Sequence, residues 1–356
     1  MRSQLDYGLT IYGAAKSSYF QGAKVIQNQG LRICLGAFKS SPVDSLHVEA
    51  RELPLRLRHE KLLLQYALRI SGNTANPAAG HLNQLDEREK YARKTDYIPP
   101  FNIRVAKLLQ ECNLSLESIC KLQPPSVPPW KMHKPDIDMS LTVMKKGETA
   151  DITYQAAFKE MRDAHRDHHT IFTDGSHMNN RTASAAVHGN HIFSERLPDK
   201  ASIYTAEVNA LYLAQDHVET CDETKHLILS DSKSSLEAMR SRTWTHALVN
   251  KVLERHHSLT DQGKVIKYGW IPGHAGIRGN DLADTAAKDA TNKVELPFAL
   301  PSPDYRRETN TFINKKWQSK WDNTQTNRLK SIQPKINKAK KPRTYCRRDE
   351  IIMSRL

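Results

Sequence analysis

Between residues 170 and 290 the chain alternates strand-like and helix-like segments, and this order restricts the fold more than any other feature. Three β candidates come first, with a turn at Gly189-Asn190 between the second and third. Helix-like and strand-like segments then alternate over 202–218, 226–230, 232–240, 247–259, 264–271 and 280–290. This order predicts an α/β domain in which an antiparallel meander is followed by helical crossovers, giving a five-stranded mixed sheet flanked by helices.

The segments on either side have a different character. Residues 1–95 show apolar residues at helical spacing, and we expect Ser41 to cap one helix with Pro42 at its first position. Pro pairs punctuate residues 96–165, which predicts a linker with one short helix near 105–111. Residues 166–292 form the predicted α/β domain. Residues 293–356 are expected to be a basic tail, partly helical over 309–331 or disordered.

Charge is distributed unevenly along the chain, whose formal net charge is +14. Residues 168–290 hold 13 Lys and Arg against 15 Asp and Glu, whereas residues 301–356 hold 15 against 5. A mildly acidic centre between basic flanks is typical of a protein that binds a polyanion around a metal-holding site. On charge alone, a solvated disordered tail explains the basic end equally well.

Several protein classes are excluded. No apolar run approaches the ~20 residues that span a bilayer, and residues 7–15 are too short and interrupted for a secretory signal. The five cysteines form no C-x-x-C pair, so neither a disulfide framework nor a zinc site is expected. We expect an intracellular protein, in the nucleus or the cytoplasm and not secreted.

Four carboxylates occupy informative positions in the central block. Asp174 directly follows a strand, Glu207 lies early in a helix, Asp231 ends a strand and Asp284 lies about one turn into the last helix. Strand ends and facing helix turns of an α/β fold meet at one edge of the sheet. Four acids placed together repel one another unless hard cations neutralise them, so the pattern predicts a site for two Mg²⁺ ions, with Mn²⁺ also suitable.

These residues lie in motifs that resemble type 1 ribonuclease H. The motifs are Ile171-Phe172-Thr173-Asp174-Gly175-Ser176, Thr205-Ala206-Glu207, Leu229-Ser230-Asp231-Ser232, Trp270-Ile271-Pro272-Gly273-His274-Ala275-Gly276 and Gly279-Asn280-Asp281-Leu282-Ala283-Asp284. Their order and spacing over about 120 residues match the family. The resemblance implies a ribonuclease H fold and endonucleolytic hydrolysis of the RNA strand of RNA–DNA hybrids, which leaves 3′-hydroxyl and 5′-phosphate ends.

The resemblance also implies a role for each matched residue. Asp174, Glu207, Asp231 and Asp284 correspond to the metal-binding acids of the family, and Glu207 to the one near the substrate 2′-hydroxyl. His274 corresponds to the loop histidine that assists proton transfer and product release. Without the resemblance, His274 would be interpreted as an ordinary loop residue.

Two features depart from cellular members of the family. Many of them insert a basic helix where this chain has only Arg240-Ser241-Arg242-Thr243-Trp244, so hybrid affinity is expected to come from the basic tail and the basic N-terminal part. Cellular members often place polar minor-groove readers just before the Glu, where this chain has Ile203-Tyr204.

A wider resemblance covers the flanks. Leu5-Asp6-Tyr7-Gly8, Gln29-Gly30-Leu31-Arg32, Gly36-Ala37-Phe38 with Ser41-Pro42-Val43, and Glu60-Lys61-Leu62 resemble the segment after the reverse transcriptase of jockey-like non-LTR retrotransposons. The chain contains no Tyr-x-Asp-Asp polymerase motif. It is interpreted as a polyprotein fragment: a helical thumb-like remnant (1–95), a linker, a ribonuclease H domain and a basic tail.

Three functions stay open at this point. The first is a Mg²⁺-dependent endoribonuclease that binds hybrids by phosphates and shape without reading base edges. The second is a catalytically decayed module that binds hybrids or RNA without cutting. The third is another nuclease of the same fold, which the Gly-His-Ala-Gly loop disfavours. Sequence preference, oligomeric state and the role of residues 1–165 are not indicated by the sequence.

Overall fold

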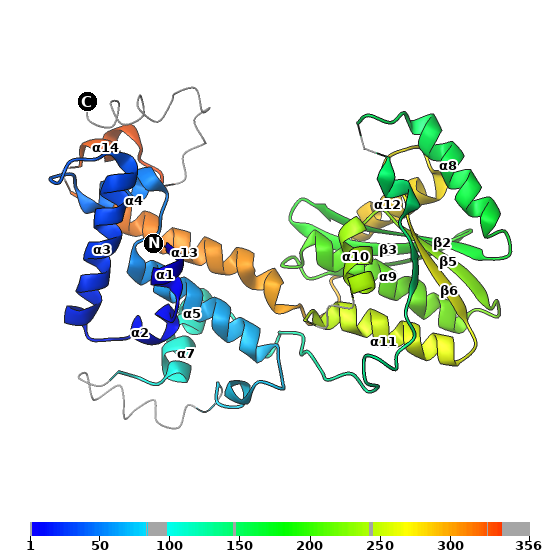
Figure 1. Cartoon of the computed structure of the whole chain (residues 1–356), viewed down its shortest axis with the longest axis horizontal. Coiled ribbons are helices and arrows are strands. Elements are labelled where there is room, and N and C mark those ends of the chain that lie inside the picture. The colour runs from blue at the N-terminus through cyan, green and yellow to red at the C-terminus, as the bar shows by residue number, and fades with distance from the viewer. Residues whose placement is uncertain are drawn as a thin grey trace. The chain divides into compact units, whose positions relative to one another are not determined.

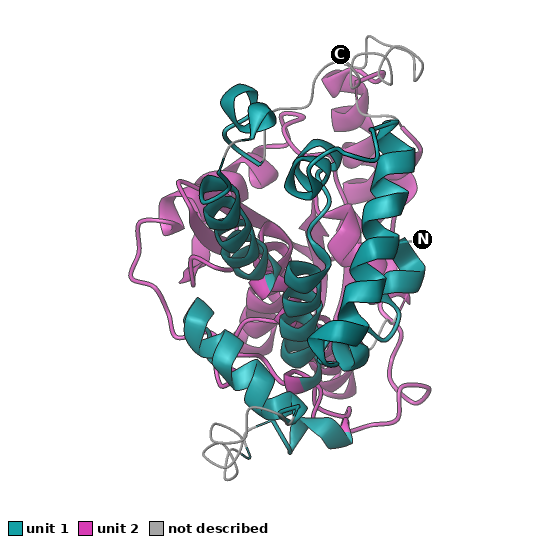
Figure 2. Cartoon of the chain, turned by 90° about the vertical axis from the view of Figure 1, so that its left-hand side faces the viewer, with its two compact units in different colours: residues 1–70, 77–115, 306–356 teal, residues 71–76, 116–305 magenta. Residues whose placement is uncertain are grey.

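The computed structural model describes residues 2–82, 84, 98–144, 147–241, 245–325 and 327–336. The chain divides into two compact units (Figure 2): residues 1–70, 77–115 and 306–356 form the first, and residues 71–76 and 116–305 form the second. None of the helices in these described ranges combines the length and apolar composition that a bilayer span requires.

The first unit is helical, and its elements come from both ends of the chain. Its elements are α1 (Arg2–Asp6), α2 (Leu9–Tyr12), α3 (Ser17–Leu35), α4 (Val43–Ala50), α5 (Leu55–Ser71, in this unit up to Ile70), a 3-10 turn (Pro77–Ala79), α7 (Phe101–Cys112), α13 (Arg306–Asp322) and α14 (Arg328–Ile332). The helix expected after Ser41 begins one residue later than predicted, with Pro42 as its N-cap and no side-chain hydrogen bond at that cap.

Part of the expected basic tail belongs to the core of this first unit. Ile313, Trp317 and Trp321 lie on one face of α13, at the spacing of successive helical turns, and pack with Val48 and Leu57. Trp321 is 1% exposed, and its Nε1 donates to the carbonyl of Gln333 over 3.0 Å. The expected single helix over 309–331 is interrupted between α13 and α14. Residues 337–356 lie outside the described residues.

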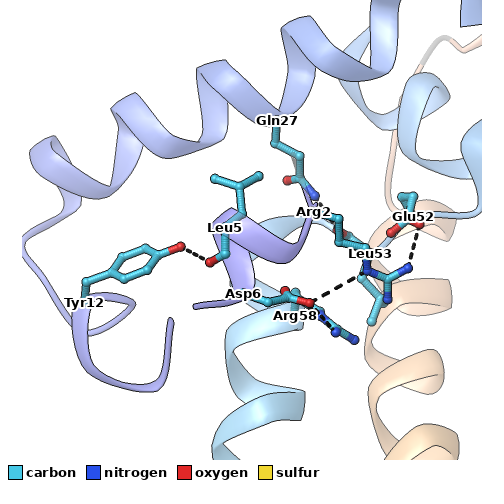
Figure 3. A network of polar contacts seen from close by, with 8 residues as sticks. All are labelled: Arg2, Leu5, Asp6, Tyr12, Gln27, Glu52, Leu53 and Arg58. Atoms are coloured by element: carbon cyan, nitrogen blue, oxygen red, sulfur yellow. Dashed lines mark hydrogen bonds and ion pairs between the residues drawn. The ribbon is translucent and has the colours of Figure 1, made fainter. Parts of the chain in front are cut away.

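Polar contacts join the ends of the first unit's helices (Figure 3). The Arg58 guanidinium donates to Asp6 with an Nε–Oδ1 distance of 2.9 Å, while Arg2 pairs with Glu52 at 2.8 Å. Gln27 donates from its side chain to the Leu53 carbonyl over 2.9 Å. These bonds tie α1 and α3 to α5 and to the segment that leads into it. The Arg58–Asp6 and Gln27–Leu53 contacts are partly buried, which makes them stronger than an exposed pair such as Arg2–Glu52.

The second unit is built on a six-stranded mixed sheet (Figure 1). Its strands are β1 (Asp136–Asp138), β2 (His169–Met178), β3 (Arg181–His188), β4 (His191–Leu197), β5 (Lys225–Ser230) and β6 (Val265–Trp270). The strand order is β1-β6-β5-β2-β3-β4. Strands β2, β3 and β4 form an antiparallel meander. The pairs β1–β6, β6–β5 and β5–β2 are parallel, so β2 joins the two parts of the sheet. All five expected strands are present, and β1 extends the sheet by one.

Helices cover both faces of this sheet. Its helices are two 3-10 turns (Ser140–Val143 and Ser302–Tyr305), α8 (Asp151–Ala164), α9 (Ile203–Thr220), α10 (Lys233–Ser241), α11 (Ala247–Asp261) and α12 (Arg278–Ala290). Ala186 of β3 packs in the cluster that contains α9 and α11, whereas its neighbours Ala185 and Val187 pack with α12. Because successive strand residues face opposite sides, α9 and α12 lie on opposite faces of the sheet.

Much of the expected linker is structured. Residues 136–138 form β1, paired in parallel with β6, and α8 packs Met161 against Gly269, where an added Cβ would lie 3.3 Å from the Met161 sulfur. Leu141 and Met161 belong to the main core cluster of the second unit. The segment that was expected to lack the basic helix of cellular family members joins α10 to α11. Its residues Arg242, Thr243 and Trp244 lie outside the described residues.

Candidate active site

Two neighbouring parallel strands bring Asp174 and Asp231 to the same edge of the sheet. Strands β2 and β5 are paired with Thr173 opposite Ser230, so each Asp follows one member of that pair. The Thr173 hydroxyl donates to the Leu229 carbonyl over 3.0 Å and fixes this register further. The carboxyl ends of adjacent parallel strands are a common location for α/β sites. The structure thus juxtaposes two carboxylates that the sequence separates by 57 positions.

Helix α9 brings Glu207 to the same edge. Ser202 caps the helix, and its hydroxyl accepts the backbone N–H of Thr205 over 3.2 Å. Gly175 allows the helix to approach, because a Cβ at this position would lie 2.7 Å from the Glu207 backbone nitrogen. Any other residue would push α9 away from β2, so the glycine after Asp174 fixes the distance between the two carboxylates.

The three carboxylates converge. Asp174, Glu207 and Asp231 each offer an oxygen, and these atoms lie within 4.8 Å of one another. Asp174 is 6% exposed, and burial, followed by the charges of Asp231 and Asp284, raises its pKa to about 8. Burial, then Asp231 and Asp174, raise the pKa of Glu207 well above its ordinary value. In the metal-free site at neutral pH the Asp174 carboxyl is therefore largely protonated.

One oxygen of this cluster is left without a partner. Glu207 Oε2 is buried and finds no hydrogen-bond donor among the described residues. A buried carboxylate oxygen without a donor is costly unless a cation occupies the space in front of it. The three carboxylates, including this unpaired Glu207 oxygen, form an all-oxygen ligand set of the kind that divalent cations such as Mg²⁺ and Mn²⁺ accept.

The loop after β6 closes over Asp231. A Cβ on Gly273 would lie 2.3 Å from Asp231 Oδ2, so only glycine permits this approach. Trp270 at the end of β6 donates its indole N–H to the Asp231 carbonyl over 3.0 Å. The motif that contains Trp270 and Gly273 thus fixes the backbone and the side chain of Asp231 from one side.

Asp284 lies near the three acids but outside their close group. It is on α12, and its Oδ2 is 2.6 Å from the Lys288 ammonium one turn later. Its charge contributes to the raised pKa of Asp174, which places it within electrostatic reach of that carboxylate. A cation in the site would compete with Lys288 for the Asp284 carboxylate.

His274 lies in the loop between β6 and α12. It is exposed, and its φ of +58° places its backbone in the left-handed region. Gln155 of α8 donates its side-chain amide to the Ala275 carbonyl over 2.9 Å, and a Cβ on Gly276 would lie 2.6 Å from that amide nitrogen. The role of Gln155 is not visible in the sequence, because a single polar residue in an expected linker does not differ from an ordinary surface residue.

The comparisons with known proteins concern the second unit. Residues 166–292 match the family model of RNase H. The Pol polyprotein of equine infectious anemia virus, isolate 1369, is 27% identical over 127 residues, which are 33% of this chain and 10% of the polyprotein. Isolate CL22 gives the same values, and the Wyoming strain is 26% identical over the same length. The chain thus spans about a tenth of the length of these relatives.

Among solved structures, the chain is similar to the N-terminal RNase H domain of a Mycobacterium tuberculosis protein fused to maltose-binding protein. The identity is 24%, the TM-score is 0.29, and the match covers 35% of this chain and 94% of the other. The family match and the mixed sheet with helices on both faces agree with the fold expected from the sequence. Residues 166–292 form an RNase H domain with the RNase H fold.

Proposed function

We propose that this domain hydrolyses the RNA strand of RNA–DNA hybrids endonucleolytically, as a type 1 ribonuclease H. The observation that carries the proposal is the convergence of Asp174, Glu207 and Asp231, with a buried Glu207 oxygen that lacks a donor, inside a domain that matches the RNase H family. Such a cluster of hard oxygen ligands at a sheet edge suits phosphodiester chemistry.

The acids would hold two divalent cations, Mg²⁺ or Mn²⁺. Asp174 would be among the residues that hold them, because it belongs to the close group of three carboxylates and also feels the charge of Asp284. When bound, the cations supply charge neutralisation for the attacking and leaving oxygens of the phosphodiester. Burial, and then the neighbouring acids, raise the pKa of Asp174 and Glu207, and both carboxyls would lose their protons on taking up a cation.

The remaining residues act on protons and substrate position. His274 is exposed on a loop with glycines on either side of the His-Ala pair, where its imidazole can reach a bound substrate and transfer a proton. From the resemblance of its motif to type 1 ribonuclease H, Glu207 is proposed to lie near the substrate 2′-hydroxyl and to accept its hydrogen bond. The products are expected to carry a 3′-hydroxyl and a 5′-phosphate.

Cleavage of a labelled RNA–DNA hybrid tests this proposal. With Mg²⁺, only the RNA strand of the hybrid should be cut, while double-stranded RNA and double-stranded DNA of the same sequence stay intact. Asp174→Asn should abolish cutting and keep hybrid binding, whereas the exposed control Asp281→Asn should cut normally. A folded wild-type protein that binds hybrids tightly without cutting would instead indicate the decayed binding module.

His274→Ala tests the proposed proton transfer. We expect the variant to retain slow cleavage, because the acids still hold the cations while the side chain proposed to transfer the proton is lost. An unchanged rate would remove His274 from the mechanism.

The flanking parts give the context of the proposal. We infer that the chain derives from a retrotransposon polyprotein of the jockey-like type, in which residues 1–95 followed a reverse transcriptase. The basic C-terminal residues are proposed to bind nucleic acid through phosphates and to supply affinity that the missing basic helix would otherwise provide.

A further inference from the structure

A second cluster of metal-ligating side chains lies toward the opposite end of α9. His188 ends β3, His217 lies in the last turn of α9 and Cys221 is the C-cap of that helix. His217 follows Glu207 by ten positions, and this corresponds to about 15 Å along a helix axis. The cluster is therefore separate from the carboxylate site, although one helix contributes to both.

The distances within the cluster are close to those of a tetrahedral metal site. His188 Nδ1 lies 2.8 Å from His217 Nε2, and Cys221 Sγ lies 3.2 Å from the same nitrogen. Each residue offers one ligand atom, and all three lie within 4.8 Å of one another. Ligands at the usual Zn–N and Zn–S bond lengths in a tetrahedron are separated by about 3.3 Å and about 3.6 Å. Small side-chain rotations would therefore admit an ion.

The surroundings hold these side chains in place. The Phe193 ring stacks on His217 with centroids 4.4 Å apart. The Lys264 ammonium donates to the carbonyls of Cys221 and Glu223, the latter over 2.9 Å, and thereby fixes the loop that follows α9. All three candidate ligands are half-buried. Part of the ordering that a metal site requires is thus present before any ion binds.

The protonation states also favour a cation. Burial, followed by the nearby His188, His226 and His191, lowers the pKa of His217 to about 4. Burial likewise lowers the pKa of His188. Both imidazoles are therefore neutral at pH 7, the form in which histidine binds metals.

We propose that His188, His217 and Cys221 bind a zinc-class divalent cation. Two imidazoles and a thiolate form a soft N₂S set that suits Zn²⁺, whereas the carboxylate site offers only hard oxygens. The fourth ligand is either a water molecule or His191, whose ring centroid is 6.5 Å from that of His217. The ion joins the end of β3, the end of α9 and the loop before β5, and thus stabilises the second unit.

Binding requires the loss of one proton from the cluster. Burial, and then the charge of Glu223, raise the pKa of the Cys221 thiol. The thiol is therefore protonated at pH 7 without a metal. Formation of the metal–sulfur bond breaks the S–H bond, and the proton passes to the buffer, so one proton is released for each ion bound.

Co²⁺ and Zn²⁺ titrations of the full chain under reducing conditions test the proposal. A large excess of Mg²⁺ occupies the carboxylates. We expect Co²⁺ to produce a thiolate-to-cobalt charge-transfer band and tetrahedral d–d absorption. Zn²⁺ should then displace Co²⁺, and when added to the Mg²⁺-loaded chain without Co²⁺ it should release about one proton per ion at pH 7.

Matched variants identify the ligands. Cys221→Ala should remove the charge-transfer band, and His188→Gln should weaken Zn²⁺ binding by at least tenfold, about the minimum cost of losing even an outer-shell partner. Cys34→Ala, an exposed cysteine of α3, should change neither. His133→Gln disrupts the more exposed group of His133, His257 and Asp261 and should likewise leave the band intact.

The spectrum separates this proposal from the proposed nuclease activity. Asp174→Asn should keep the Co²⁺ band while it abolishes cleavage. A Co²⁺ complex without a charge-transfer band, or a band that survives Cys221→Ala in a folded protein, would overturn the proposal.

Discussion

The carboxylate cluster should destabilise the metal-free protein, and Asp174→Asn measures by how much. The pKa of Asp174 is raised from 3.8 to about 8, chiefly by burial and then by Asp231 and Asp284. Since the folded value exceeds the unfolded one, the contribution of this carboxyl to stability is greatest below pH 3.8 and falls as the pH rises toward 8. Each pH unit in this interval costs about 1.4 kcal/mol, so the cost at pH 7 reaches about 4 kcal/mol.

Asparagine keeps the shape of the side chain and removes its charge. We therefore expect Asp174→Asn to raise the free energy of unfolding of the metal-free protein by about 2–4 kcal/mol at pH 7. For a unit of this size, the melting temperature should rise by about 5–15 °C. The gain should shrink steadily toward pH 4, because the wild-type carboxyl is then protonated as well.

Calorimetry in the presence of a chelator, at several pH values, provides the measurement. The control Asp281→Asn replaces an exposed carboxylate in the first turn of α12 and should change stability by less than about 0.5 kcal/mol. In saturating Mg²⁺ the order should reverse, because the cation binds only the wild-type site and stabilises it by mass action. A metal-free Asp174→Asn protein no more stable than wild type at pH 7, or a gain independent of pH, would refute the reasoning.

Three further predictions concern the site and its surroundings. Gly175→Ala should cost about 1–3 kcal/mol and reduce cleavage, because its Cβ would lie 2.7 Å from the Glu207 nitrogen; chemical denaturation and hybrid cleavage together measure this. Gln155→Ala should lower kcat for hybrid cleavage several-fold with little change in KM, and should have no further effect in a His274→Ala background if it acts by positioning the His274 loop. Deletion of residues 337–356, which hold seven Lys and Arg against two Asp and Glu, should flatten the dependence of log K for hybrid binding on log salt; an unchanged slope would show that these residues do not contact phosphates.

The strands and helices around the carboxylates could be predicted because their signals are local. Alternating apolar residues mark β3, and Asp231 follows a short apolar run and lies at a strand end as predicted. Asp174 was also expected to follow a strand, but β2 continues through it to Met178, because the residues after it pair with β3. The parallel pairing of β2 with β5 has no such local signal, because β3, β4 and α9 lie between the two strands in the sequence. The expected fold is confirmed, whereas the assignment of site residues stays a prediction that the geometry of three carboxylates supports.

Contacts between distant segments were not predictable in the same way. Strand β1 has only three residues, Asp136–Asp138, which are too few for their alternation to identify a strand, so its place in the sheet comes from pairing with β6. Spacing showed that Trp317 and Trp321 share a helical face, but spacing does not identify the partner of that face. The basic composition of the segment predicted a tail, whereas in the structure the two tryptophans are buried against Val48 and Leu57.

The histidine–cysteine cluster also depends on contacts between distant segments and could not be predicted from the sequence. Zinc sites are recognised in sequences by paired cysteines at short spacing, and this chain has none, so its sequence predicted no zinc site. The cluster arises because the antiparallel return of β3 brings His188 to the end of the sheet where α9 also ends. Since Glu207 and His217 are about 15 Å apart on one helix, the stabilisation by Zn²⁺ and that by Asp174→Asn should add. Departure from additivity would mean that α9 transmits strain between its two ends, and that the two clusters are energetically coupled through this helix.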